Sequence, residues 1–218
     1  MPKLVIFDCD GVLVDTERLT LQVYAGMLGR LGWHPAEGET LRRFLGRNHQ
    51  HMADQIESHL GRALPDDWET EYRRLTASAF ESGLSAVDGI EEALKRISIP
   101  ACVASGGSHD RIRTTLSLTG LYPYFEGRIF SAAEVENGKP APDLFLHAAQ
   151  QMAAAPADCV VVEDSPAGVE ASLSAGMRVL AYSGGVTPAS WLTVPGAIVF
   201  SEMRSLPILL NTGIDVES

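Results

Sequence analysis

The sequence predicts an α/β fold built on a parallel sheet. Short apolar runs alternate with helical patterns over most of the 218 residues. Unbroken apolar runs are typical of parallel strands, because helices cover both faces of such a sheet. The alternation stops once, after the first apolar run, where only helical patterns follow. We therefore expect a Rossmann-like parallel sheet with helices on both faces, and a small α-helical cap domain inserted after the first strand.

The predicted strands are the apolar runs at residues 4–7, 99–105, 128–131, 158–164, 178–183 and 197–200. Helix start and stop signals lie between them. Asp88 and Ser108 are candidate N-caps, and Gly120 is a candidate end for the helix that Ser108 begins. Ser165 before Pro166 is typical of an N-cap and a first helical residue. Strand and helix thus repeat in the order that a doubly wound sheet requires.

The stretch from residue 16 to residue 84 contains no convincing strand. One helix is expected from Thr16 towards Leu31, a second after Asn48 and a third after Asp66, because each carries apolar residues four positions apart. We predict a catalytic core at 1–15 and 85–218, with the cap domain at 16–84. An insertion that follows the first strand begins at that strand's carboxyl end, so we expect it to act as a lid.

Composition narrows the possible partners. The net charge is -11 and the pI is about 4.9, which argues against nucleic acid or an anionic membrane surface. No apolar run approaches the length needed to cross a bilayer. The three cysteines, Cys9, Cys102 and Cys159, have no metal or redox spacing, and we expect buried, reduced thiols in a cytoplasmic protein. We also expect a monomer.

Two acids follow the first predicted strand directly. Asp8 and Asp10 lie at its carboxyl end, and Gly11 turns the chain after them. Ligands bind at this end of the strands in open α/β sheets. Two nearby carboxylates repel each other unless a cation neutralises them, and carboxylate and carbonyl oxygens suit Mg²⁺. The pair therefore indicates a magnesium site.

Three later strand ends supply other polar groups. Ser105 is followed by glycines whose amides are suited to phosphate oxygens. Lys139 lies in a proline-rich turn and offers one ammonium group to two anionic partners, the Asp8 carboxylate and a phosphate. Glu163 and Asp164 end a buried strand, where a cation is needed to offset their charge. Because parallel strands share one carboxyl edge, these groups are expected to meet.

The segments DCDGVLVDTE, VASGG, GKPAPD and VVEDSPAGVEASLSAG resemble the four ordered motifs of the haloacid dehalogenase (HAD) superfamily. The similarity is greatest to its phosphatase and β-phosphoglucomutase-like branch with an inserted helical cap. The resemblance implies a HAD-type phosphoric monoester hydrolase, acting on a small phosphorylated metabolite such as a sugar or polyol phosphate.

The resemblance also implies a role for each motif residue. Asp8 would attack phosphorus and form an aspartyl-phosphate. Asp10 would protonate the leaving oxygen and then deprotonate the attacking water. Ser105, Gly106 and Lys139 would hold the phosphate oxygens.

The implied cofactor is Mg²⁺. Its ligands would be the Asp8 carboxylate, the Asp10 backbone carbonyl and Asp164, with Glu163 bound directly or through water. Four further residues are candidate substrate contacts in the cap: Glu17, Thr20, Arg43 and Arg47.

Other functions of the same fold remain open. β-Phosphoglucomutases carry a histidine where this chain has Thr20, which favours a phosphatase over a sugar-phosphate mutase. A carbon–halogen hydrolase would need neither Asp10 nor the acids at 163 and 164. A non-catalytic sugar-phosphate-binding protein is the remaining alternative.

Overall fold

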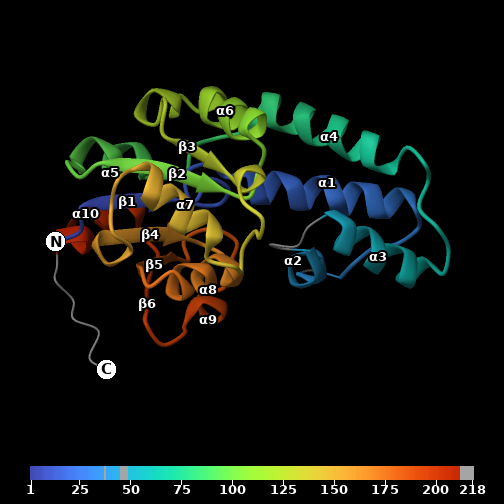
Figure 1. Ribbon diagram of the computed structural model, residues 1–218. Helices are drawn as coiled ribbons and strands as arrows, with labels where there is room; N and C mark the ends of the chain where they lie inside the picture. The colour runs from blue at the N-terminus through green and yellow to red at the C-terminus, as the bar shows by residue number, and fades with distance from the viewer. Residues whose placement is uncertain (37, 45–48, 212–218) are drawn as a thin grey trace. The chain divides into compact units, whose positions relative to one another are not determined.

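The computed structural model describes residues 1–36, 38–44 and 49–211. The chain folds into two compact units, one formed by Met1–Asp15 with Ser85–Ser218 and the other by Thr16–Leu84. Figure 1 shows the strands gathered in the first unit and helices alone in the second. Each unit has its own apolar core.

The first unit is built on a parallel sheet. Among the described residues its strands are β1 Leu4–Phe7, β2 Ala101–Ser105, β3 Ile129–Ser131, β4 Cys159–Glu163, β5 Arg178–Tyr182 and β6 Ala197–Phe200. They pair in the order β3-β2-β1-β4-β5-β6, and every pairing is parallel. The predicted parallel α/β sheet is therefore confirmed. Strand β2 begins at Ala101, later than predicted, because Pro100 has no N–H to donate to a ladder.

Helices cover both faces of this sheet (Figure 1). The helices of the first unit are α5 Ile90–Arg96, α6 His109–Leu118, α7 Asp143–Gln151, α8 Pro166–Ser174, α9 Ala189–Leu192 and α10 Leu206–Asn211. Short 3₁₀ turns lie at η1 Tyr122–Tyr124, η2 Ala132–Glu134, η3 Pro156–Asp158 and η4 Met203–Ser205. Helices α7 and α8 pack on the face that Leu4 and Ile6 line. Phe7 points the other way and meets Phe125 edge-on, with ring centroids 5.8 Å apart.

Two of the three predicted N-caps are confirmed. The Ser108 hydroxyl accepts from the Arg111 amide at 3.4 Å, and the Ser165 hydroxyl accepts from the Gly168 amide at 3.0 Å. The prediction for Asp88 is wrong. Helix α5 has Gly89 at its N-cap, and the Asp88 carboxylate instead forms a two-pronged ion pair with Arg204, with N···O distances of 2.7 and 2.9 Å. The helix begins one residue later than predicted, so Asp88 precedes the N-cap and its carboxylate is left to pair with Arg204.

The second unit consists of α1 Thr16–Arg30, α2 Glu39–Phe44, α3 His49–Leu60 and α4 Trp68–Gly83. The three helices predicted here are confirmed, and the short α2 was not predicted. Their core is aromatic: Tyr24 stacks on Phe44 and on Tyr72, with centroids 5.6 and 4.6 Å apart. In the described part of the chain, no helix is long and apolar enough to span a membrane.

Candidate active site

The loop after β1 places Asp8 and Asp10 at the carboxyl edge of the sheet. The Asp8 amide donates to the Val162 carbonyl at 2.9 Å, which extends the pairing with β4 one residue beyond the strand. Gly11 then turns the chain with φ +79°. A Cβ on Gly11 would also overlap the Asp164 carboxylate. Only glycine both adopts this backbone and leaves room for that acid.

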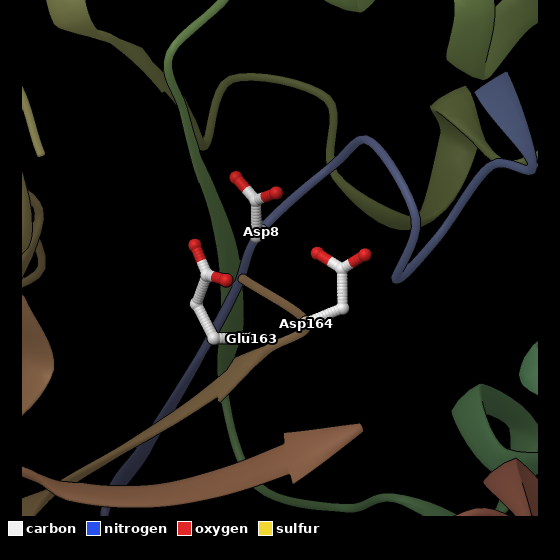
Figure 2. Close-up of side chains that lie close together, drawn as sticks. All are labelled: Asp8, Glu163 and Asp164. Carbon is white, nitrogen blue, oxygen red and sulfur yellow. The ribbon is translucent and has the colours of Figure 1, made fainter. Parts of the chain in front are cut away.

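Three carboxylates converge at this edge. Asp8, Glu163 and Asp164 are all buried, and one oxygen of each lies within 4.8 Å of the others. Figure 2 shows the three side chains rising together from the ends of β1 and β4. The register pairs Phe7 with Val162, which brings Asp8 level with Glu163, the last residue of β4. As predicted, the ends of these two strands lie side by side in the structure.

Lys139 lies among these acids. Its ammonium donates to Asp8 Oδ1 at 2.6 Å and to Glu163 Oε1 at 2.7 Å, and its side chain is only 12% exposed. It also lies 4.8 Å from the centre of the Phe145 ring. Burial opposes the charged form, but the two carboxylates outweigh it, and the pKa of Lys139 is raised above its usual range. A fixed positive charge therefore borders Asp8.

Glu163 is held from its other side. Its Oε2 accepts from the Ser165 amide at 2.7 Å and from the Ser165 hydroxyl at 2.9 Å. Gly168 packs so closely on this carboxylate that a Cβ there would overlap it. Glu163 is thus engaged by Lys139 on one oxygen and by Ser165 on the other, which fixes its orientation.

The raised pKa of Asp8 indicates that the buried acids lack a fully neutralising cation. Burial, opposed by Lys139 and reinforced by Glu163 and Asp10, raises the pKa of Asp8 from 3.8 to about 7. A buried carboxylate with such a raised pKa is stabilised by a nearby cation. The three converging carboxylates of Asp8, Glu163 and Asp164 offer oxygen ligands, which hard divalent ions prefer. The residues therefore fit a bound divalent ion.

The loop after β2 has its own supports. Ser105 is buried at the end of β2, and its hydroxyl accepts from the Gly107 amide at 3.1 Å. The Ser131 hydroxyl donates to the Gly107 carbonyl at 2.6 Å from the end of β3. Gly106, between the two held residues, is exposed. These contacts fix the backbone around Gly106 at the sheet edge.

Arg111 is a residue at this edge that the sequence did not single out. Its Nη2 donates to Asp10 Oδ1 at 3.3 Å from the first turn of α6. A signal was present in the sequence, because a cation is unfavourable in the first turn of a helix. An arginine at that position is therefore expected to pair with an acid from another part of the chain.

The candidate substrate contacts at Glu17, Thr20 and Arg43 lie in the helical unit. Glu17 and Thr20 are half-buried on α1. Arg43 Nε donates to Glu39 Oε1 at 2.8 Å, and the guanidinium lies 5.3 Å from the Trp33 ring centre. Arg47 lies outside the described residues. These positions remain predictions.

The cysteines are buried and free, as predicted. Cys9, between the two acids, lies 3.8 Å from the Thr115 hydroxyl. Burial, with the negative charges of Asp10 and Asp8, raises the pKa of Cys9 well above its ordinary value. A thiol in that state is a poor nucleophile.

The parallel α/β sheet thus carries clustered acids and a buried lysine at its carboxyl edge, the edge where ligands bind in open α/β sheets. Residues 2–176 match the model of the haloacid dehalogenase-like hydrolases. The chain belongs to that family. The resemblance noted in the sequence is confirmed, and so is the prediction that the protein is an enzyme.

Relatives extend along nearly the whole chain. The 6-phosphogluconate phosphatase of Escherichia coli strain K12 is 31% identical over 209 residues, which are 95% of this chain and 94% of that protein. A haloacid dehalogenase-like protein of unknown function from Agrobacterium tumefaciens is 36% identical, with a TM-score of 0.89 over 97% of this chain and 98% of that one. A putative β-phosphoglucomutase from Thermotoga maritima is 26% identical, with a TM-score of 0.79 over 96% and 98% of the two chains.

Proposed function

We propose that this protein is a Mg²⁺-dependent phosphomonoesterase that hydrolyses a small phosphorylated metabolite, a sugar or polyol phosphate, through an aspartyl-phosphate. The observation that carries the proposal is the buried Asp8 carboxylate, 2.6 Å from the Lys139 ammonium and two residues before a second acid. The relative that is named as a 6-phosphogluconate phosphatase supports a phosphorylated sugar derivative as substrate.

Asp8 is the nucleophile in this proposal. One of its carboxylate oxygens forms a bond to phosphorus while the bond from phosphorus to the metabolite's oxygen breaks. Asp10 gives its proton to that departing oxygen. In the second step Asp10 takes a proton from water, whose oxygen attacks phosphorus and releases Asp8 and inorganic phosphate.

The ammonium of Lys139 and the groups around Ser105 hold the phosphate. Lys139 offsets part of the repulsion between the Asp8 carboxylate and the phosphate dianion. Glu163 holds that ammonium in place, at 2.7 Å. The Ser105 hydroxyl and the Gly106 amide are the proposed partners of the remaining phosphate oxygens.

Mg²⁺ would be held by the Asp8 carboxylate, the Asp10 backbone carbonyl and the Asp164 carboxylate. When bound, the ion supplies positive charge that reduces repulsion at the phosphate and stabilises the charge of the transition state. Glu163 has hydrogen bonds to both of its oxygens. We therefore propose that Glu163 reaches the ion through water and mainly orients Lys139.

We propose that the unit Thr16–Leu84 is a substrate-selecting cap, with hinges at 15–16 and 82–87. Glu17, Thr20, Arg43 and Arg47 are the candidate contacts to the metabolite. We further propose that the protein is a cytoplasmic monomer that binds neither nucleic acid nor membrane, in keeping with its net negative charge.

The second candidate is a sugar-phosphate mutase, favoured by the similarity to the putative β-phosphoglucomutase. Thr20 weakens it, because the mutases carry a histidine at this position. Either activity would use the same aspartyl-phosphate.

The test is phosphate release from a panel of sugar and polyol phosphates, with Mg²⁺ and with a chelator. Wild type and Asp8→Asn run side by side, and glucose 1- and 6-phosphates are checked for interconversion. Release that needs both Mg²⁺ and Asp8 supports the phosphatase. Interconversion without net release identifies the mutase, and stoichiometric binding without turnover identifies a binding protein.

A further inference from the structure

Arg111 and Asp10 form an ion pair beside the proposed nucleophile. The guanidinium lies 3.3 Å from Asp10 Oδ1, and the two side chains are 36% and 25% exposed. The partners are 101 residues apart in the sequence, with Asp10 in the loop after β1 and Arg111 on α6 of the same unit. Chain connectivity therefore does not force this contact.

The position of Arg111 on its helix is electrostatically unusual. It is the third residue of α6, where the helix dipole disfavours a cation. Helical side chains lean towards the N-terminus, and α6 begins just after the carboxyl end of β2. That lean carries the guanidinium over the edge of the sheet, towards Asp10. The Asp10 carboxylate offsets the unfavourable interaction between Arg111 and the helix dipole.

The loop before α6 leaves a path for this side chain. A Cβ on Gly107 would lie 3.4 Å from Arg111 Cδ, so the aliphatic stem runs directly past Gly107. The same glycine is fixed from two sides, by Ser105 and by Ser131. The stem thus rests on a backbone that two hydrogen bonds hold.

We propose that Arg111 is a positioning residue that holds the Asp10 carboxyl towards the leaving-group oxygen. The inference rests on the proposed function, in which Asp10 transfers a proton to that oxygen as its bond to phosphorus breaks. The guanidinium engages Oδ1 and so fixes rotation about the Cβ–Cγ bond of Asp10. At 3.3 Å the bond is long, as such contacts often are before substrate binds.

The test separates proton transfer from substrate binding. Substituted phenyl phosphates share one shape but differ in leaving-group acidity, and 4-nitrophenolate needs the least protonation. The value of kcat/KM reports the steps up to loss of the phenol, before Asp10 acts on water. It is measured at saturating Mg²⁺ for wild type, Arg111→Ala, Arg111→Lys and Arg113→Ala; Arg113 is an exposed arginine on the same helix.

We expect Arg111→Ala to lose about tenfold or more on phenyl phosphate and under about threefold on 4-nitrophenyl phosphate. The plot of log kcat/KM against phenol pKa therefore becomes steeper. Arg111→Lys restores part of the loss, and Arg113→Ala follows the wild-type line. In an Asp10→Ala background, removing Arg111 has little further effect, because the two act as one unit.

A parallel downward shift of the whole line would overturn the proposal, since it would mean that Arg111 contributes to binding or to the fold. An undiminished loss in the Asp10→Ala background would overturn it as well. If wild type shows no phosphate release that depends on Asp8 and Mg²⁺, the proposed function is wrong, and so is the inference that rests on it. Thermal melts of all variants identify any loss of fold.

Discussion

Replacement of Asp8 by asparagine is expected to abolish turnover and yet stabilise the fold when no divalent ion is bound. Asparagine has nearly the shape of aspartate but cannot ionise. It therefore relieves the repulsion from Glu163 in a site where Asp8 is buried. Lys139 retains its ion pair with Glu163 in the variant.

The size of the effect follows from the pKa of Asp8, which burial raises from 3.8 to about 7. Between these two values the folded protein binds more protons than the unfolded chain, so its stability falls as the pH rises. At 1.36 kcal/mol per pH unit, the full interval corresponds to about 4 kcal/mol. From pH 5 to pH 8, the stability lost because of Asp8 is about 2 to 3 kcal/mol, since the loss levels off above about pH 7.

The measurement is urea denaturation of wild type and Asp8→Asn at pH 5 and pH 8, each with a chelator and with Mg²⁺. With the chelator, wild type should lose about 2 to 3 kcal/mol more than the variant between the two pH values. Groups remote from Asp8 titrate alike in both proteins and cancel in this difference. Added Mg²⁺ should reduce the wild-type loss, since a bound cation favours the carboxylate.

Two results would refute this reasoning. Equal pH dependence of the two proteins in chelator would mean that Asp8 is not under electrostatic stress. Undiminished phosphate release by Asp8→Asn would remove Asp8 as the nucleophile.

Three further outcomes are expected. Asp164→Ala should weaken Mg²⁺ binding by at least about tenfold, measured by titration of activity against Mg²⁺; superimposed curves would show that Asp164 is not a ligand. Glu163→Gln should lower kcat by about tenfold or more with a smaller change in Mg²⁺ affinity, because it weakens the hold on Lys139; a change in metal affinity alone would make Glu163 a direct ligand. Cys102, whose pKa burial raises to about 12, should resist iodoacetamide in the native protein at pH 8 and react after unfolding, as mass spectrometry would show; rapid native alkylation would contradict its burial.

Much of the site was predictable because its elements have local signals. Apolar runs mark buried parallel strands, and their carboxyl ends meet at one edge in any such sheet. Asp8, Lys139, Glu163 and Asp164 each follow or end such a run, or lie in the turn beyond one, so the sequence predicts their meeting without coordinates. The caps at Ser108 and Ser165 were predictable for the same reason, since a cap depends on the next three residues alone.

Some pairings between distant side chains could not be predicted in this way. Lys139 was expected to meet Asp8, but its second bond, to Glu163, was not predicted. Arg111 reaches Asp10 across 101 positions, and only the tertiary fold selects that partner. Asp88 shows the same point in reverse, because its local pattern predicts a cap while Arg204, 116 positions away, takes its carboxylate. The sequence by itself determined which chemical groups line the edge of the sheet. Only the tertiary structure decided which of them pair, because pairing depends on distances that loop paths and packing set.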